Sequence, residues 1–452
     1  MTQKTSLAIV LAAGQGTRMK SARPKVLHEI AGLSMLAHVM EAAKDSGLSE
    51  AALVVAPGMS AVEGAARSVE PDVQVFVQDA QLGTAHAVLA ARGALEAFCG
   101  DVIILYGDTP LLRTKTLQKI LDALKEGADL AVLGFEAENP TGYGRLITDD
   151  KGQLKAVREE KDASDEERAV TLCNSGVFAF RGDKVLGLLD RIGNDNANGE
   201  YYLTDAVELA CGDGLKTGVV TCAEREVMGV NSKVQLATAE AELQQRLRAS
   251  AMEEGATLIA PETVFLSKDT KLGRDVIVEP NVVFGAGVRV EEGARIRAFS
   301  YLEGAHVGKG AIVGPFARLR PGADLGVDVR VGNFVEVKNA RMEEGSKANH
   351  LAYVGDARVG AGANLGAGTI TCNYDGFAKH HTDVGKGVFV GSNSALVAPV
   401  KIGDGAFIGS GSVISKDVPA DALVVTRGPL DQRSGWAAKV RARRNRSSGN
   451  KK

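Results

Sequence analysis

A glycine-rich segment near the start of the sequence holds the first residues whose types and spacing could do chemistry. Residues 11–19 read LAAGQGTRM and are followed by Pro24-Lys25. Such a loop between a strand and a helix lets backbone N–H groups face a phosphate, aided by the helix N-terminus. Met19 replaces the glycine that a dinucleotide fingerprint or a Walker A loop would need, so neither motif fits. Arg18 and Lys25 are candidate phosphate clamps, and a tight turn with solvated basic residues is the alternative interpretation.

A carboxylate follows a second apolar run. Asp108 lies just beyond residues 102–105, in the string YGDTP. The carboxyl ends of strands are where an open α/β sheet gathers its ligand. Because hard cations take carboxylate and phosphate oxygens, Asp108 is a natural ligand for Mg²⁺. A turn aspartate before Pro110 is the alternative interpretation.

A cluster of polar residues stands out in the second half of the chain. It comprises Arg320, Lys338, residues 349–353 (NHLAY), Asn364, residues 371–376 (TCNYDG) and Lys379. A lone histidine in a repeat is usually a solvated turn residue. Cationic and amide side chains accompany His350, however, and such a set suits recognition of phosphate and amide groups. His380 and His381 are interpreted as solvated.

The element that must position this cluster is a repeat in which an apolar residue returns at every sixth position. The three runs are Leu272, Val278, Phe284, Val290, Ile296, Leu302; Val313, Leu319, Leu325, Val331, Val337; and Val384, Val390, Leu396, Ile402, Ile408, Ile414. This is the hexapeptide pattern of a parallel β-helix, in which three short strands close a triangular coil and the apolar residues point inward. Glycine often follows the inward residue, and we expect it to serve tight corners at positive φ. The rhythm breaks between Leu365 and Val384, which predicts an extruded loop around residues 372–383, a usual place for binding groups.

The first half of the chain alternates short apolar runs with helical patterns. Strands are predicted at 7–13, 51–56, 73–78, 102–106 and 130–135, and helices at 35–45, 85–97 and 114–125. This alternation implies βαβ units and a mostly parallel, Rossmann-like sheet. Residues 232–254 contain no Pro or Gly and predict a long helix capped by Gly255. We therefore expect an α/β domain over 1–230, a linker helix over 231–254 and a β-helix domain with a basic tail over 255–452.

Composition limits the class of protein further. A chain of 452 residues is too long for one core, and a net charge of −3 gives no case for nucleic acid. No stretch reaches the roughly 18–20 apolar residues of a membrane helix. Five cysteines without a C-x-x-C pair fit a reducing compartment. We expect a cytoplasmic protein with neither a nucleic-acid nor a membrane partner.

The whole N-terminal string is more specific than its parts. LAAGxGTRM with PK resembles the signature of sugar-1-phosphate nucleotidyltransferases. Further motifs follow in that family's order: Gln78, QLGT at 81–84, YGD at 106–108, GYGR at 142–145, Glu159, NSG at 174–176, EYYLTD at 200–205 and GVN at 229–231. A lysine is common in that family where this chain has Gln15. The resemblance implies attack of a sugar phosphate on the α-phosphorus of a nucleoside triphosphate, with pyrophosphate leaving and cations screening the charge.

The resemblance also assigns residues to this first site. Arg18 and Lys25 would act on the phosphates, and Asp108 with Asn231 would hold one or two Mg²⁺ ions. Gln78, Gly83 and Thr84 would lie near the uracil, and Gly144, Glu159 and Asn174 at the sugar. The complete set expected to bind UTP or UDP-N-acetylglucosamine is Leu11, Ala12, Ala13, Gly14, Lys25, Gln78, Gly83, Thr84, Tyr106, Gly107, Asp108, Gly144, Glu159, Asn174 and Asn231.

Over essentially its full length the chain is similar to the family of bifunctional bacterial N-acetylglucosamine-1-phosphate uridylyltransferases/glucosamine-1-phosphate acetyltransferases. GSKANHLxY and TITCNYDG carry this wider resemblance. It implies a homotrimer of left-handed β-helices with acetyl-transfer sites between subunits. His350 would be the general base for the glucosamine amine, and Asn373 would orient the amine or stabilise the oxyanion. Glucosamine-1-phosphate would bind Arg320, Lys338, Tyr353, Asn364 and Lys379, and acetyl-CoA would bind Ala367, Asn373, Tyr374, Ser392, Ser410 and Arg427.

The expected function is a two-step synthesis of UDP-N-acetylglucosamine, a precursor for peptidoglycan and, where present, lipopolysaccharide. Acetyl-CoA acetylates glucosamine-1-phosphate, and UTP with Mg²⁺ then uridylylates the product. The alternative is a single-activity sugar-1-phosphate nucleotidyltransferase whose β-helix only assembles or regulates, but such a chain should lack His350, Asn373 and the extruded loop. A non-catalytic subunit would be expected to have lost Arg18, Lys25 or Asp108.

Overall fold

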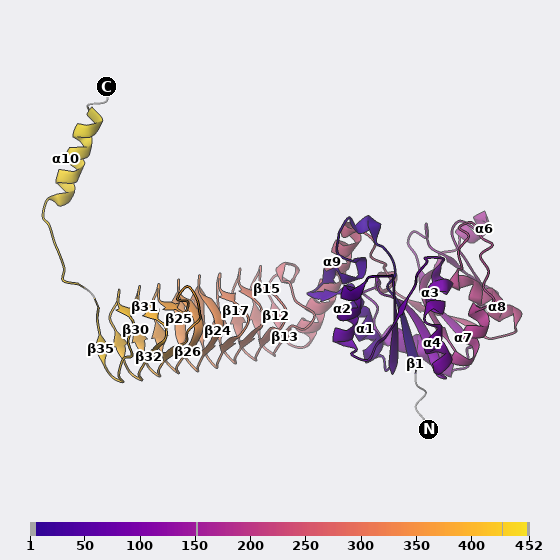
Figure 1. The fold of residues 1–452 in the computed structure, drawn as a ribbon, viewed down its shortest axis with the longest axis horizontal. Coiled ribbons are helices and arrows are strands. Elements are labelled where there is room, and N and C mark those ends of the chain that lie inside the picture. The colour runs from indigo at the N-terminus through magenta and orange to yellow at the C-terminus, as the bar shows by residue number, and fades with distance from the viewer. Residues whose placement is uncertain (1–5, 151, 427, 450–452) are drawn as a thin grey trace. The chain divides into compact units, whose positions relative to one another are not determined.

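The computed structural model describes residues 6–150, 152–426 and 428–449. The chain divides into two compact units (Figure 1). Unit 1 contains the residues up to Ser250 together with Leu266–Lys268, and unit 2 contains Ala251–Phe265 and the residues from Asp269 onward.

Unit 1 is built on a nine-stranded sheet whose main order is β11-β7-β10-β6-β1-β4-β5. Its strands are β1 (Ser6–Leu11), β4 (Glu50–Val55), β5 (Gln74–Val77), β6 (Asp101–Tyr106), β7 (Leu130–Glu136), β8 (Arg145–Thr148), β9 (Leu154–Arg158), β10 (Leu172–Phe180) and β11 (Thr217–Cys222). The sheet is parallel except where β10 runs antiparallel to β6, β7 and β8, and where β8 pairs with β9. Neighbouring β1 and β6 are buried runs, so their carboxyl ends bring residues 11–16 and 106–110 to one edge.

Helices cover both faces of this sheet, as Figure 1 shows. One face packs against α1 (Met35–Asp45), α2 (Ser60–Val69) and α5 (Thr114–Lys125), and the other against α3 (Thr84–Ala90), α4 (Arg92–Ala97), α7 (Gly182–Leu189) and α8 (Ala206–Gly212). The prediction of a single helix over 85–97 was wrong, because Ala91 leaves the helical region at φ −90° and ψ 22°. This turn starts a second short helix, which keeps Ala85, Ala94 and Leu95 in the same buried cluster.

The predicted linker helix is α9 (Lys233–Glu253). Its Ala239 and Leu243 pack within unit 1 against Ile30, Met35 and Leu111. The buried amide of Gln244 donates to Leu266 O at 2.6 Å and accepts from Leu266 N at 2.9 Å. This paired contact explains why Leu266–Lys268 belong to unit 1 although they lie beyond the helix in sequence.

Unit 2 is the parallel β-helix. Its first coil begins at Thr257, which is earlier than Leu272, the first residue of the predicted repeat. Face 1 consists of β12 (Thr257–Leu258), β14 (Ile277–Val278), β17 (Arg295–Ile296), β20 (Ile312–Val313), β23 (Arg330–Asn333), β25 (Lys347–His350), β27 (Asn364–Leu365), β30 (Phe389–Val390), β33 (Phe407–Ile408) and β35 (Leu423–Val424). Face 2 consists of β15 (Val283–Phe284), β18 (Tyr301–Leu302), β21 (Arg318–Leu319), β24 (Glu336–Met342), β26 (Tyr353–Val359), β28 (Ile370–Cys372), β31 (Ala395–Val397) and β34 (Val413–Ile414). Face 3 consists of β13 (Lys271–Leu272), β16 (Arg289–Val290), β19 (Ala305–Val307), β22 (Ala323–Leu325), the later parts of β24 and β26, β29 (Thr382–Val384) and β32 (Val400–Ile402). After the last coil, α10 (Trp436–Gly449) forms the basic tail.

The glycines that follow the inward residues are needed for space, which corrects the expectation of positive φ. Gly314 has φ +93°, but Gly273, Gly326 and Gly391 do not lie in the left-handed region. A Cβ on Gly273 would lie 2.7 Å from Glu292 N in the next coil, and one on Gly391 would lie 2.7 Å from Ser410 Cα. The left-handed positions at the edge between faces 1 and 2, the first edge below, include Asn281, Phe299, Phe316, Phe334, Leu351, Gly368, Asn393 and Gly411.

On the outer side of face 3, charged side chains of successive coils form hydrogen bonds with one another. His306 lies between Asp324, whose Oδ1 is 2.8 Å from Nδ1, and Glu291, whose Oε1 is 3.0 Å from Nε2. Burial opposes protonation of His306, but hydrogen bonds with Asp324 and Glu291 outweigh it and raise the pKa of the imidazole. The protonated form therefore carries the favourable interaction.

The stability of unit 2 should consequently depend on pH through His306. Because the folded-state pKa lies above the unfolded value of about 6.5, the stabilisation is complete below that pH and fades as pH rises through the folded pKa. Thermal unfolding of His306→Asn, followed by circular dichroism, should show a lower midpoint than the parent chain at pH 6 and a smaller difference at pH 9. The exposed His381 gives the matched control, His381→Asn. A midpoint difference that grows with pH would contradict this prediction.

Candidate active sites

The first candidate site is a cavity of about 370 Å³ at the carboxyl edge of the unit 1 sheet. Ten of the residues expected to bind nucleotide line it: Leu11, Ala12, Ala13, Gly14, Lys25, Gln78, Gly83, Thr84, Tyr106 and Asp108. Main-chain contacts build its wall, because Gly107 N donates to Leu11 O at 3.0 Å and Gln78 N donates to Val55 O at 2.8 Å. The cavity therefore lies where β1, β5 and β6 end.

Three polar side chains converge at one end of this cavity. The ammonium of Lys25 makes a short ion pair with Asp108 and donates to Asn231 Oδ1 at 3.0 Å. Both side chains of the ion pair are mostly buried, with 12% and 17% of Lys25 and Asp108 exposed. A carboxylate and an amide oxygen thus point at one positively charged atom. Such oxygen donors suit a hard divalent cation, so Asp108 and Asn231 fit the predicted metal role.

A second cavity of about 420 Å³ continues from the first. Thr84, Tyr106 and Glu200 line both, and Glu159 and Asn174, two of the residues expected at the sugar, line the second. Burial raises the pKa of Glu159, and the charges of Asp162 and Asp205 raise it further. Burial likewise raises the pKa of Tyr106, followed by the charges of Asp108 and Glu159. The two cavities together offer a cationic end and a sugar-sized, carboxylate-bearing end.

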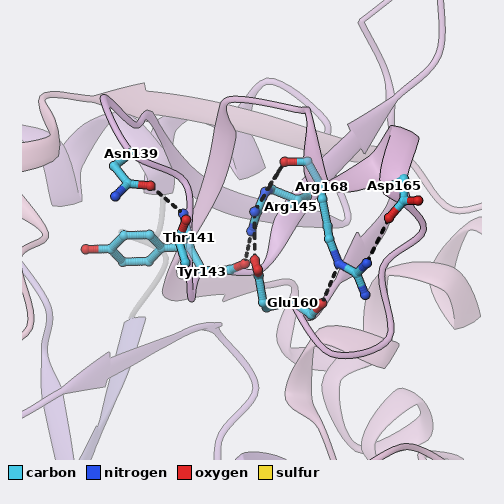
Figure 2. A network of polar contacts seen from close by, with 7 residues as sticks. All are labelled: Asn139, Thr141, Tyr143, Arg145, Glu160, Asp165 and Arg168. Carbon is cyan, nitrogen blue, oxygen red and sulfur yellow. Dashed lines mark hydrogen bonds and ion pairs between the residues drawn. The ribbon is translucent and has the colours of Figure 1, made fainter.

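A buried arginine joins the segments beside the second cavity, and Figure 2 shows its network of polar contacts. Arg145 is only 1% exposed. Its guanidinium pairs with Glu160 at 2.7 Å, donates to Arg168 O at 3.3 Å and makes a short hydrogen bond to Tyr143 O. Arg168 in turn pairs with Asp165 at 3.0 Å, at the short helix α6 (Asp165–Arg168). A buried charge needs such partners, and here they tie together the segments on either side of Gly144 and Glu159.

The structure places the remaining predicted residues of unit 1 close to these cavities, with one exception. A Cβ on Gly144 would lie 3.3 Å from Glu159 Oε1, and Asn174 N donates to Gly144 O at 2.8 Å. Arg18 is exposed on the 3-10 helix Thr17–Met19 and is not among the cavity-lining residues. Gln81 and Glu200 had no predicted role, although the strings QLGT and EYYLTD contain them. Gln81 lines the first cavity and donates to Ala13 O at 2.6 Å.

The loop that carries Glu200 docks against the QLGT segment. Tyr201 N donates to Leu82 O at 2.8 Å, and Ala85 N donates to Tyr201 O at 2.9 Å. Gly83 has φ +120°, and a Cβ there would lie 2.5 Å from Tyr201 O. Only glycine satisfies both the conformation and the close approach. Gly83 is thus needed to join the walls of the two cavities.

The second candidate site lies on unit 2, where His350 stands on the first edge. His350 Nδ1 is 2.8 Å from Asn333 Oδ1, one coil earlier. Backbone hydrogen bonds continue along this edge: Gly368 N to His350 O at 3.2 Å, Asn393 N to Ala367 O at 2.7 Å, and Gly411 N to Ser392 O at 2.8 Å. Ala367 and Ser392, two of the predicted acetyl-CoA residues, therefore lie in line with His350, and Ser410 precedes Gly411 on the next coil. Arg427, also predicted there, lies outside the described residues.

The predicted sugar-phosphate residues mostly gather on face 2 and its far edge. Tyr353 lies across Gly355, where a Cβ would come within 2.5 Å of Tyr353 Cζ, and its hydroxyl accepts from Asn373 Nδ2 at 3.3 Å. Contact with Lys338 lowers the pKa of Lys379, and the charge of Lys338 adds to this effect. Two ammonium groups held this close favour an anion between them. Arg320 pairs with Glu336 on the same face, whereas Asn364 lies on face 1 between Lys347 and Phe389.

The predicted extruded loop is present between β28 and β29, and its own side chains brace it. Asp375 Oδ1 accepts from Phe377 N at 2.8 Å and Ala378 N at 2.7 Å, and Asp375 pairs with His380 Nε2 at 2.7 Å. These hydrogen bonds, from Ala378 first and then His380, hold the pKa of Asp375 well below its usual range. The interpretation of His380 as merely solvated was therefore wrong, because its imidazole holds the loop. Tyr374 is 62% exposed, which leaves it open to a ligand.

Comparison with known proteins gives a family match in each of the two units. Residues 8–171 match the family model of the MobA-like NTP transferase domain, and residues 381–416 match the bacterial transferase hexapeptide (six repeats). Proteins named "Bifunctional protein GlmU" are 60% identical in Azorhizobium caulinodans, over 98% of this chain and 99% of the relative, and 57% identical in Xanthobacter autotrophicus, over 99% and 100%. One from Agrobacterium fabrum is 53% identical over 98% of this chain and 97% of its own.

The chain belongs to the bifunctional GlmU family. The family expected from the sequence is thereby confirmed, and with it a bifunctional uridylyltransferase/acetyltransferase that makes UDP-N-acetylglucosamine. The single-activity alternative and the non-catalytic alternative are set aside. Among the described residues, no helix is long and apolar enough to cross a membrane.

The docking at Gly83 yields a test of whether the two cavities carry uridylyl transfer. Gly83→Ala should lower kcat/KM for uridylyl transfer about 10²-fold, because the displaced loop misplaces both walls of the cavities. Acetyl transfer by the same protein should be unchanged. Gly93 in α4 gives the matched control, since a Cβ there meets only Phe76 Cε1 at 3.7 Å. If Gly83→Ala and Gly93→Ala behaved alike in a pyrophosphate-release assay, the docking argument would fail.

Proposed function

We propose that the two cavities of unit 1 carry uridylyl transfer and that the first edge and face 2 of unit 2 carry acetyl transfer. This assignment depends on one observation: the two sets of candidate catalytic residues lie in different units. Lys25, Asp108 and Asn231 converge beside one cavity, whereas His350, Ala367 and Ser392 share one edge of the β-helix. Each group contains the residue types that its reaction requires. We further propose the boundaries 1–230, 231–254 and 255–452 for the catalytic domain, linker helix and β-helix domain.

In unit 1, UTP would occupy the first cavity, with Gln78, Gly83 and Thr84 at the base. N-acetylglucosamine-1-phosphate would occupy the second, against Glu159 and Asn174. Asp108 and Asn231 would hold Mg²⁺, which when bound neutralises charge on the transferring phosphates. Lys25 is placed to contact a phosphate, and the exposed Arg18 would close over the leaving pyrophosphate.

In unit 2, His350 would remove a proton from the amine of glucosamine-1-phosphate as it attacks the thioester carbonyl. Its contact with Asn333 through Nδ1 holds the ring and leaves the other ring nitrogen to accept that proton. Lys338 and Lys379 would hold the phosphate of the sugar. Acetyl-CoA would run along the first edge past Ala367, Ser392 and Ser410, with Tyr374 and Arg427 as further contacts.

These parts of the acetyl-transfer site favour assembly between subunits. His350 lies on the first edge, whereas Lys338, Asn373 and Lys379 lie toward the other edge of face 2. Beside His350, the first edge also exposes an apolar ladder, with Phe299, Phe316, Phe334 and Leu351 between 46% and 61% exposed. The first three rings stack at 4.9 and 5.3 Å between centroids. A contiguous apolar strip of this kind favours burial against another copy, as in the homotrimer that we propose.

We also propose that the protein acts in the cytoplasm, where both cosubstrates are available.

Replacement of the metal-binding carboxylate tests the first assignment. Asp108→Ala should lower Mg²⁺-dependent pyrophosphate release from UTP and N-acetylglucosamine-1-phosphate by about 10²–10³-fold or more, because charge on the phosphates is no longer screened. Release of free CoA thiol from acetyl-CoA and glucosamine-1-phosphate should be unaffected. Asp72, exposed on the surface, gives the control Asp72→Ala. Uridylyl transfer that persisted in Asp108→Ala would contradict the proposed metal-binding role of Asp108.

Subunit mixing tests the second assignment. His350→Ala should lower acetyl transfer about 10²–10⁴-fold, the usual range for a general base, with uridylyl transfer intact. Lys338→Ala should raise the KM for glucosamine-1-phosphate. Co-expression of the two variants should restore part of the activity, since some sites would then combine His350 of one subunit with Lys338 of the other. Mixed oligomers with no more activity than the separate variants would show that each site belongs to one subunit.

A further inference from the structure

Asp356 is a carboxylate at the acetyl-transfer site that the proposed function leaves without a role. It lies in β26 at the far edge of face 2, with φ +47°. Its Oδ1 accepts from Asn339 Nδ2 at 2.6 Å, one coil earlier, and its Oδ2 accepts a short hydrogen bond from Asn373 Nδ2. Asp356 therefore joins a residue of the neighbouring coil to the asparagine that begins the extruded loop.

The chemistry of a carboxylate fixes which end of the Asn373 amide faces Asp356. An ionised carboxylate has acceptors and no donor, so the group beside it must be the NH₂. Burial opposes ionisation of Asp356, but hydrogen bonds from Asn339 and Asn373 outweigh it, with the charges of Lys379 and Lys338, and its pKa is lowered. The amide of Asn373 thus has one orientation, and the side chain itself is only 8% exposed.

Both N–H groups of this amide are then occupied. One is donated to Asp356 and the other to the Tyr353 hydroxyl at 3.3 Å. Within the described parts of the chain, no recorded hydrogen bond reaches Asn373 Oδ1, which is left as an acceptor. The Tyr353 oxygen accepts from Asn373, so its own O–H remains able to donate. The site therefore presents one acceptor and one donor side by side.

We propose that Asp356 is a positioning residue that holds Asn373 with its amide oxygen toward the amine of glucosamine-1-phosphate. This inference rests on the proposed acetyl-transfer function of unit 2. The substrate carries an amine, which donates, and a phosphate, which accepts, on neighbouring carbons. Asn373 Oδ1 accepts a hydrogen bond from the amine N–H and so orients the nitrogen lone pair toward the thioester carbonyl. The Tyr353 hydroxyl donates a hydrogen bond to the phosphate. Asn373 has no N–H left for an oxyanion, so it orients the nucleophile.

Single substitutions separate this role from a purely structural one. Asp356→Asn keeps the size of the side chain but no longer dictates the orientation of Asn373. We expect kcat for acetyl transfer to fall about 10–100-fold, the range for a lost hydrogen bond to a charged group, with the KM for acetyl-CoA unchanged. Asn339→Gly removes the other contact of Asp356 and tolerates the positive φ of that position, 44°. It should change kcat less than twofold.

An exchange of the two side chains tests whether position 373 accepts or donates. In the double variant Asp356→Asn with Asn373→Asp, the new amide donates to the new carboxylate, which still offers an acceptor to the amine. The double variant should therefore be about tenfold more active than Asn373→Asp alone, in which two carboxylates face each other. If position 373 had to donate to an oxyanion, the exchange could not restore activity.

The readouts distinguish failure of this inference from failure of the proposed function. An unsubstituted protein that uridylylates but does not acetylate would overturn the proposed function. Normal acetyl transfer by Asp356→Asn, an equal loss in Asn339→Gly, or an exchange that recovers nothing would each overturn the role of Asp356. Uridylyl transfer by unit 1 serves in every variant as the internal measure of the amount of intact protein.

Discussion

The close stacking of coils is the constraint on which the second half of this protein depends. Parallel strands in one face lie about 4.8 Å apart, so side chains one coil apart in the chain become nearest neighbours. Glycine at positions such as Gly273 and Gly391 gives the main chain room to approach at that distance. The stacking then aligns Asn333, His350, Ala367 and Ser392 along a single edge, although about 60 residues of sequence separate the first from the last. The register of the coils alone therefore aligns these four residues.

In unit 1, the ends of neighbouring strands, rather than stacked coils, position the residues of the candidate site. The buried strands β1 and β6 are parallel neighbours whose carboxyl ends lie side by side, which brings Lys25 and Asp108 together, and Asn231 joins them just before α9 begins. The wall of the second cavity is built from antiparallel additions, β8, β9 and β10, which a purely parallel sheet would lack. Arg145 stabilises that wall from inside, where its charge is matched by Glu160 and by backbone carbonyls. The burial of this arginine accounts for its place in the GYGR string.

Much of this could be predicted from the sequence because the signals were local. The spacing of inward residues gave the β-helix, and the motif strings located the cavity-lining residues of unit 1. Other features depended on distant neighbours that periodicity does not reveal. The spatial reason for the glycines follows from contacts with the next coil. The turn at Ala91 and the pairing of His380 with Asp375 are local, but neither has a periodic signal. Glu200 and Gln81 stood inside recognised strings, yet their places beside the cavities required the docking of loop 196–203 on residues 81–85.

Asp356 shows how a repeat can carry chemistry that its consensus does not require. The left-handed corner that it occupies is filled by Asn339 one coil earlier, so either side chain satisfies the backbone. A carboxylate at 356 differs from an amide in one respect, because it can only accept, and that restricts the orientation of Asn373. The long loop after Cys372 supplies Asn373 and Lys379, while the regular coils supply Asp356, Lys338 and Tyr353 against which they are held. The loop therefore contributes Asn373 and Lys379 to a site whose base, His350, stands on a regular coil, and the stacked coils fix the direction of the loop residues.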